Sequence, residues 1–317
     1  MGSRRGRISV LFSLALAATT AKAQPAIIPR ARPDAPAKPL ERASVRVDAN
    51  LVLVPVTVCD AMNRPVTGLD RNDFRVFDDN IEQTVTAFSA EDEPVAVGLV
   101  FDVSGSMGPK IRLSRMAAAA FFGTANPEDE FFLVEFNEKP KLTVPLTRDT
   151  QEILSRLAFS QPKGRTALLD AIMLALHELK RSSKGRKALL IISDGGDNSS
   201  RYTQRELKEA VRESDVLVYA IGVYGGAVSA EEVAGPGLLT SIAEESGGRH
   251  VPGDASEMPD IAAKIGVEMR NRYLLGYSPT DPQRDGRYHP VQVKVVPPTG
   301  LPPLHASWRH GYYAPAD

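Results

Sequence analysis

The sequence predicts an α/β protein: a doubly wound, mostly parallel sheet with an accessory β-sandwich formed by the two flanks of the chain. Between residues 94 and 270, continuous apolar runs alternate with stretches of helical periodicity. That alternation is typical of parallel strands joined by helices. On either side of this part, short runs of β-forming residues are separated by turn residues. Such runs are typical of antiparallel strands.

The α/β part begins with the apolar run at 95–101. A run of this length without polar alternation is typical of a parallel strand covered on both faces. The next segment is expected to be a helix with one buried face, because apolar residues recur with helical spacing at Leu113, Met116, Ala117, Ala120 and Phe121. Further strands are expected at 131–136, 142–144 (an antiparallel edge), 188–192, 216–221 and near His250, and further helices at 150–157, 167–179, 203–212, 238–245 and 256–270.

The flanking segments, 44–92 and 271–313, are expected to pack together. Strands are expected at 45–58, 73–77, 84–88, 273–277, 289–296 and 305–312, with a turn at Asp78-Asp79-Asn80. A few short strands cannot bury a face alone and need a partner layer. We therefore expect one β-sandwich made from both flanks, with the α/β part inserted between them.

The first residues have the features of an export signal. Three arginines lie among the first seven residues, 8–20 are mostly apolar, and 21–23 fit a small-x-small cleavage site. This apolar run is too short for an ordinary transmembrane helix, and no later segment approaches a membrane span. Residues 1–23 are therefore expected to be a signal peptide and the mature protein to be secreted or periplasmic. The proline-rich segment 24–43 is expected to be an extended linker.

Composition and motifs exclude several classes of function. The formal net charge of −1 gives no reason to propose nucleic acid or an acidic membrane surface as a partner. The single cysteine, Cys59, excludes an intramolecular disulfide framework. The sequence contains no nucleophile elbow, phosphate loop or zinc-protease helix, and the tail histidines His289, His305 and His310 show no metal-ligand spacing. We therefore predict that the protein is not an enzyme.

Oxygen-bearing side chains gather where the first strand of the α/β part should end. Asp102, Ser104 and Ser106 alternate directly after the apolar run, and Gly105 and Gly108 allow the backbone to turn there. The carboxyl end of an open α/β sheet is where ligands bind. A carboxylate and two hydroxyls at that end indicate a site for a small hard cation such as Mg²⁺.

This D-x-S-x-S pattern resembles the start of the metal-ion-dependent adhesion site in the von Willebrand factor type A family. The resemblance implies a Rossmann-like fold over 94–270, a Thr from a second loop and an Asp from a third. Both are present: Thr166 lies in Gly-Arg-Thr-Ala-Leu before an apolar helix, and Asp194 lies in Ser-Asp-Gly-Gly-Asp-Asn after the strand at 188–192. One such cluster alone is usually a turn or a helix cap. Three clusters in this order favour a metal site.

The resemblance also implies a role for each residue. Ser104, Ser106 and Thr166 are expected to ligate Mg²⁺ directly, and Asp102 and Asp194 directly or through water; Mn²⁺ and Ca²⁺ are the alternative cations. The open coordination position is then expected to take an Asp or Glu of a protein partner, as in the family.

Four further residues are expected to lie around these ligands. Those expected to surround the metal without touching it are Gly105, Gly195, Asp197 and Asp170. For Asp197 the alternative is a solvated loop residue. For Asp170 the alternative is a bond to the loop backbone or to another helix.

The whole of 45–313 also resembles exported bacterial proteins with a type A domain, through L-x-G-Y at 274–277 and Gly311-Tyr312. The predicted function is therefore an exported, metal-dependent protein-binding module of the adhesion type. One alternative is a Mg²⁺-assisted hydrolase with Asp197 as its base. The other is a structural component of an envelope complex, in which the metal stabilises the three loops.

Overall fold

The structure is a computed structural model that describes residues 51–90, 92–225, 230–253, 257–280, 284–298, 300 and 302–316, without the side chains of 230–232. All of the described residues belong to one compact unit, 48–317. The expected signal peptide, linker and strand residues 45–50 lie outside the described residues. Within the described part, no helix is long and apolar enough to cross a membrane.

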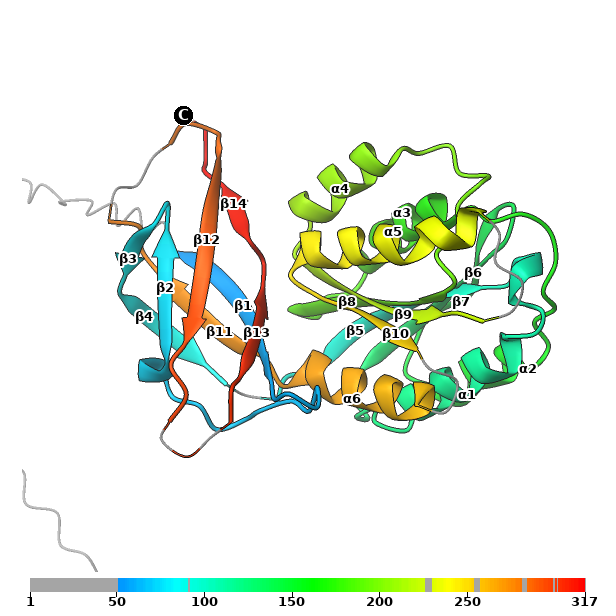
Figure 1. Cartoon of the computed structure of the whole chain (residues 1–317), viewed down its shortest axis with the longest axis horizontal. Helices are drawn as coiled ribbons and strands as arrows, with labels where there is room; N and C mark the ends of the chain where they lie inside the picture. Colours follow the sequence, from blue (N-terminus) through cyan, green and yellow to red (C-terminus); the bar gives the residue numbers. More distant parts are fainter. Residues whose placement is uncertain are drawn as a thin grey trace, which may run out of the picture. The chain divides into compact units, whose positions relative to one another are not determined.

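A six-stranded sheet forms the centre of the α/β part, with the strand order β10-β9-β8-β5-β6-β7 (Figure 1). Its strands are β5 (Val95–Asp102), β6 (Glu130–Phe136), β7 (Pro140–Thr147), β8 (Arg186–Ser193), β9 (Val216–Val223) and β10 (His250–Gly253). Neighbouring strands are parallel except for β6 and β7, which are antiparallel. The predicted fold class and antiparallel edge are confirmed.

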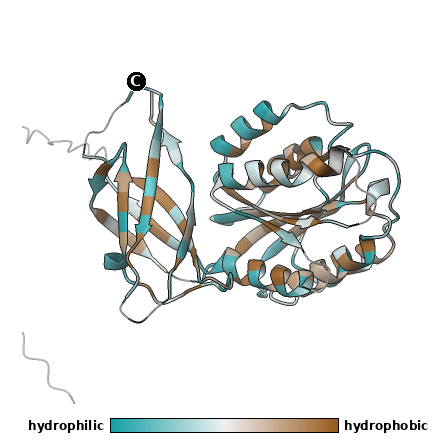
Figure 2. Cartoon of the chain, viewed as in Figure 1, coloured by the Kyte–Doolittle hydropathy of each residue, from teal (hydrophilic) through white to brown (hydrophobic). Residues whose placement is uncertain are grey.

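Helices cover both faces of this sheet (Figure 1). They are α1 (Ile111–Phe122), α2 (Thr150–Ala158), α3 (Leu168–Leu179), α4 (Gln204–Glu213), α5 (Ala230–Ser246) and α6 (Met258–Arg270). One hydrophobic cluster joins the sheet to α1, α2 and α6, and a second joins it to α3, α4 and α5. Figure 2 shows the apolar residues concentrated in the central strands and on the helix faces towards them. Every residue of β5 is buried, as its uninterrupted apolar run predicts.

The predicted buried face of α1 is wrong in part. Met116 is 45% exposed, whereas Ser114 is fully buried. The hydroxyl of Ser114 donates to the carbonyl oxygen of Lys110 at 3.2 Å. Its polar group is therefore satisfied inside the helix, and the helix presents a face rotated away from Met116.

The flanks form two antiparallel four-stranded sheets, β13-β1-β11-β4 and β14-β12-β2-β3. Their strands are β1 (Val52–Cys59), β2 (Phe74–Asp78), β3 (Ile81–Gln83), β4 (Val85–Ser89), β11 (Tyr273–Tyr277), β12 (Tyr288–Val295), β13 (His305–Trp308) and β14 (Gly311–Tyr313). Both sheets contribute to one hydrophobic core, and each contains strands from both flanks. A short helix, η1 (Arg71–Asp73), precedes β2. The division into domains at 94 and 270 stays a prediction.

Two expected strands of the flanks differ in the structure. The single strand expected at 305–312 is wrong, because it is divided into β13 and β14. These two strands lie in different sheets, β13 beside β1 and β14 beside β12. The chain therefore crosses from one layer of the sandwich to the other at Arg309-His310. The strand β3 was not expected and completes a hairpin with β2.

The Cys59 thiol on β1 is expected to be unreactive in the folded protein. Only 6% of the residue is exposed, and burial, followed by the negative charge of Glu268, raises the pKa of the thiol to about 12. Since the thiolate is the reactive form, labelling at pH 8 should be slower than for a free cysteine by about 10³-fold. A chromogenic disulfide reagent should label the protein fast only in denaturant. Fast stoichiometric labelling of native protein would contradict this.

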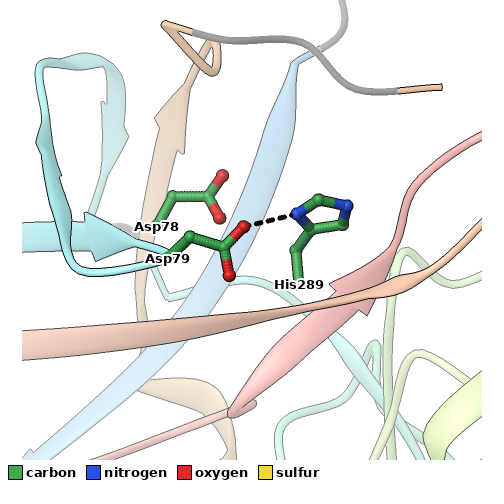
Figure 3. Close-up of side chains that lie close together, drawn as sticks. All are labelled: Asp78, Asp79 and His289. Carbon is green, nitrogen blue, oxygen red and sulfur yellow. Dashed lines mark hydrogen bonds and ion pairs between the residues drawn. The ribbon is translucent and has the colours of Figure 1, made fainter. Parts of the chain in front are cut away.

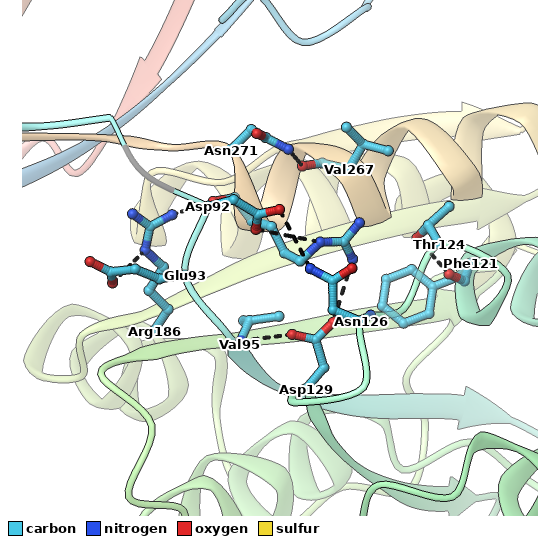
Figure 4. A network of polar contacts seen from close by, with 11 residues as sticks. Asp92, Glu93, Val95, Phe121, Thr124, Asn126, Asp129, Arg186, Val267 and Asn271 are labelled. Atoms are coloured by element: carbon cyan, nitrogen blue, oxygen red, sulfur yellow. Dashed lines mark hydrogen bonds and ion pairs between the residues drawn. The ribbon is translucent and has the colours of Figure 1, made fainter.

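A network of polar contacts around the buried carboxylate of Asp129 holds the two ends of the α/β part together (Figure 4). The carboxylate of Asp129 accepts hydrogen bonds from the N–H groups of Val95 at 3.0 Å and Asn126 at 2.8 Å. Its Oδ2 also lies 3.5 Å from Nη1 of Arg270, the last residue of α6. Arg270 in turn lies 3.7 Å from Asp92. Asp129 therefore connects the first strand of this part to its last helix.

Replacing Asp129 by Ala is expected to destabilise the protein by about 3–5 kcal/mol, because a buried guanidinium and two N–H groups lose their acceptor. The measurement is urea unfolding. Asp215→Ala is the matched control: that carboxylate also pairs with an arginine, Arg309 at 2.8 Å, but is 93% exposed. Its loss should cost roughly 0–1 kcal/mol. If Asp129→Ala lowered the free energy of unfolding by no more than roughly 0–1 kcal/mol, the range expected for Asp215→Ala, the buried network would not be stabilising.

Candidate metal centre

The five predicted ligands lie on three loops at the carboxyl edge of the central sheet. Asp102 is the last residue of β5. Ser104 directly precedes the short helix η2 (Gly105–Met107), and Ser106 lies within it. Asp194 directly follows β8, and Thr166 precedes α3. The two aspartates and Ser104 are fully buried and Thr166 is 5% exposed, whereas Ser106 is exposed. The acidic residues therefore lie inside, with Ser106 towards solvent.

Backbone hydrogen bonds join the three loops. The N–H of Gly105 in the first loop donates to the carbonyl oxygen of Gly164 in the second at 3.0 Å. In the second loop, the N–H of Thr166 donates to Oδ1 of Asn198 at 3.0 Å, and the N–H of Asn198 donates back to the carbonyl oxygen of Thr166 at 2.9 Å. Since Asn198 belongs to the third loop, the structure brings all three predicted loops together.

The two aspartates are both buried, and the negative charge of Asp194 acts on Asp102. Asp102 accepts hydrogen bonds from the N–H of Ser104 at 2.8 Å and from the hydroxyl of Ser193 at 2.6 Å. Burial and then the negative charge of Asp194 raise the pKa of Asp102 to about 7. Two buried carboxylates of this kind need a positive charge near them to stay ionised together.

A lysine that the sequence reasoning missed supplies one such charge. Lys110 is 7% exposed and lies directly before α1. Its Nζ is 3.0 Å from Oδ2 of Asp194. In the sequence, Lys110 can be recognised only as a basic residue four positions after Ser106, the last predicted ligand of the first loop. Its burial against Asp194 depends on how α1 begins, which the pattern of residues does not determine.

The side chains of Asp197 and Asp170 accept hydrogen bonds from neighbouring loop and helix residues. Oδ1 of Asp197 accepts the N–H of Leu168 at 2.9 Å, at the start of α3, and the hydroxyl of Ser200 at 2.6 Å. Oδ1 of Asp170 accepts the N–H groups of Arg201 and of Tyr202 at 2.8 and 3.1 Å. For Asp170, the bond to a loop backbone that we considered is present. Their assignment to the surroundings of a metal stays a prediction.

Gly195 is required by a close approach of two backbones. Its φ is +81°, and a Cβ on it would lie 2.5 Å from the carbonyl oxygen of Gly235 in α5. A Cβ on Gly235 would lie 2.2 Å from the carbonyl oxygen of Asp194. Helix α5 therefore packs directly against the third loop, and any side chain at either glycine would move Asp194. The sequence reasoning included Gly195 and missed Gly235.

Comparison with known proteins identifies the class to which this arrangement belongs. Residues 97–196 match the family model of the von Willebrand factor type A domain. A solved structure described as von Willebrand factor type A from Catenulispora acidiphila has a TM-score of 0.50 at 14% identity, covering 76% of this chain and 72% of that one. The chain therefore contains a von Willebrand factor type A domain.

Two curated relatives match over shorter regions. An uncharacterized protein of Borreliella burgdorferi is 24% identical over 177 residues, covering 47% of this chain and 51% of that protein. The inter-alpha-trypsin inhibitor heavy chain H4 of Bos taurus is 31% identical over 116 residues, which are 33% of this chain and 13% of the heavy chain. The chain thus spans about half the length of the first relative and a small part of the second.

Type A domains commonly bind a divalent metal at a metal-ion-dependent adhesion site, and the residues here fit such an ion. The donors are the hydroxyls of Ser104, Ser106 and Thr166 and the carboxylates of Asp102 and Asp194, all hard oxygen ligands. The hydroxyl oxygens of Ser104 and Ser106 are 3.1 Å apart. A divalent cation would also stabilise the ionised form of the two buried aspartates.

Proposed function

We propose that the type A domain is an adhesion-type protein-binding module that captures a carboxylate of its partner through Mg²⁺. The ion would be held by Asp102, Ser104, Ser106, Thr166 and Asp194. The observation that carries this proposal is the joining of three oxygen-bearing loops around two buried carboxylates. Mn²⁺ and Ca²⁺ are the alternative ions. When bound, the metal supplies an electrophilic centre for a negatively charged ligand.

Burial determines the side from which a partner reaches the site. Asp102 and Asp194 are fully buried, so they would hold the ion from inside the domain, and part of their negative charge is already compensated by Lys110 beside Asp194. Gly105 and Ser106 are exposed, so a partner Asp or Glu would approach over the first loop. Neutral hydroxyl ligands leave much of the cation's charge uncompensated, and this favours an anionic ligand at the open position.

The hydrolase alternative is less well supported, because its proposed base already has other contacts. Oδ1 of Asp197 accepts the backbone N–H of Leu168 and the hydroxyl of Ser200. These bonds fix the carboxylate at the start of α3, so Asp197 could activate water only through Oδ2. The sequence of residues 1–23 supports export, so we propose that the module acts outside the cytoplasm.

The test is a calorimetric Mg²⁺ titration of the protein, with and without an acidic peptide that models the partner carboxylate. The peptide should bind only with Mg²⁺ present and should tighten Mg²⁺ binding by the same factor, since coupling is reciprocal. Thr166→Ala should abolish this coupling, because it removes a ligand oxygen. Ser182→Ala, which removes a buried hydroxyl that donates to Glu130 at the start of β6, is the matched control.

Two outcomes would overturn the proposal in different ways. Peptide binding that persists in excess chelator would show that capture does not need the metal. Mg²⁺ binding that is indifferent to the peptide would favour a metal that only stabilises the loops.

A further inference from the structure

Three side chains that can ligate a metal gather in the β-sandwich, outside the type A domain. They are Asp78 at the end of β2, Asp79 in the turn after it, and His289 on β12. One ligand atom from each lies within 4.8 Å of the others. Figure 3 shows the carboxyl groups of the two aspartates beside each other, on the side towards the His289 ring.

Strand pairing brings these residues together across 210 positions of sequence. Strands β2 and β12 are antiparallel neighbours, with Asp78 opposite Val291. Asp79 has a φ of +46° in the hairpin turn. Its N–H donates to the carbonyl oxygen of Pro290 at 3.1 Å. This hydrogen bond holds the turn against β12 next to His289, so the backbone places the two aspartates beside the histidine.

Asp78 provides the observation that points to a ligand. The residue is 6% exposed, and its Oδ2 accepts hydrogen bonds from the hydroxyls of Tyr277 and Tyr312, each at 3.0 Å. Its Oδ1 is buried and has no hydrogen-bond partner among the residues that the structure describes. Leaving a buried carboxylate oxygen unsatisfied costs free energy. A cation in the cluster would satisfy it.

His289 is held in an orientation suited to metal binding. Its Nδ1 lies 2.7 Å from Oδ2 of Asp79, and its Nε2 lies 3.2 Å from Oδ1 of Asp285. The ring stacks on Tyr312, with centroids 5.6 Å apart. A carboxylate on the far nitrogen is the usual means of orienting a metal-bound histidine. Without metal the same contacts form an ion pair: burial lowers the pKa of His289, but the bonds to Asp79 and Asp285 outweigh burial and raise it.

We propose that Asp78, Asp79 and His289 form a second divalent-cation site, which prefers Zn²⁺ to Mg²⁺. Two carboxylates and an imidazole are suitable ligands for Zn²⁺, whereas Mg²⁺ prefers oxygen ligands in octahedral geometry. Because the aspartates precede the type A domain and the histidine follows it, the ion links strands from the two flanks. Bound Zn²⁺ therefore stabilises the sandwich by linkage.

The test is a calorimetric Zn²⁺ titration of the full chain in excess Mg²⁺, which limits any Zn²⁺ binding at the proposed type A site. One Zn²⁺ should bind, and Zn²⁺ should raise the melting temperature. Asp79→Asn and His289→Gln should each weaken this binding by more than about tenfold. Since the Asp79 side chain is half exposed, its substitution should leave the fold intact. His305→Gln on β13, an exposed histidine outside the cluster, is the matched control.

Asp285→Asn tests the orienting carboxylate and should weaken Zn²⁺ binding by roughly 10–100-fold. The proposal is wrong if the parent chain binds no Zn²⁺ saturably, because the cluster is then only an ion pair. It is also wrong if Asp79→Asn and His289→Gln bind Zn²⁺ as tightly as His305→Gln does. Neither outcome depends on whether Asp102 and its neighbours hold Mg²⁺, so the two sites are tested independently.

Discussion

Asp102→Asn is expected to abolish Mg²⁺ binding at accessible concentrations while leaving the fold intact. The amide keeps the shape of the carboxylate and can still accept the N–H of Ser104. It removes a full negative charge next to the cation. Two unit charges 4 Å apart attract by about 4 kcal/mol at a dielectric constant of 20, so we expect a loss of roughly a thousandfold in affinity.

Calorimetry and thermal melting together check this expectation. The melting temperature without metal should stay level or rise, because the repulsion between Asp102 and Asp194 is relieved. Asp215→Asn, at a 93% exposed carboxylate, should bind Mg²⁺ like the parent protein. Full-affinity Mg²⁺ binding by Asp102→Asn would place the cation elsewhere. Loss of folding in the same variant would show that the carboxylate is needed structurally.

Lys110→Met is expected to change metal affinity in the opposite direction. The ammonium lies 3.0 Å from Asp194 and already compensates part of the negative charge that a metal would use. With an apolar side chain of similar length, the two buried aspartates depend on the metal alone. The metal-free protein should lose about 3–5 kcal/mol of stability, as when one partner of a buried pair is removed. Mg²⁺ should bind at least about tenfold more tightly, since less opposing charge is present.

The matched control for this variant is Lys163→Met, which removes an exposed ammonium from the second loop. It should leave both quantities nearly unchanged, because exposed charges are screened by solvent. Urea unfolding with and without Mg²⁺, together with titration, separates the two effects. If Lys110→Met weakened Mg²⁺ binding, the lysine would be a support for the loop rather than a competitor of the metal.

The places of the predicted ligands at the carboxyl edge of the sheet could be predicted from sequence, because each follows a local rule. Asp102 and Asp194 come directly after uninterrupted apolar runs, and such runs form parallel strands whose carboxyl ends meet at one edge. Thr166 comes just before an apolar helix. The capping box of Thr203 and Glu206 likewise marks where α4 begins.

Residues that act across the fold could not be found in this way. Gly235 matters because the backbone of α5 contacts Asp194 and Gly195, and no local pattern reports that approach. The turn residues Asp78 and Asp79 were expected to form a turn, but their meeting with His289 depends on the pairing of β2 with β12.

For the α/β part, the sequence by itself determined the order of strands and helices, the mostly parallel sheet they form and the residues at its carboxyl edge. These follow from hydrophobic period and turn chemistry within short windows. Only the tertiary structure decided the rotation of α1 that buries Ser114 instead of Met116, the passage of the chain between β13 and β14 and the ion pair of Lys110 with Asp194. Each of these depends on which distant surface an element packs against. Burial and long-range pairing are properties of the whole fold, so no local segment determines them.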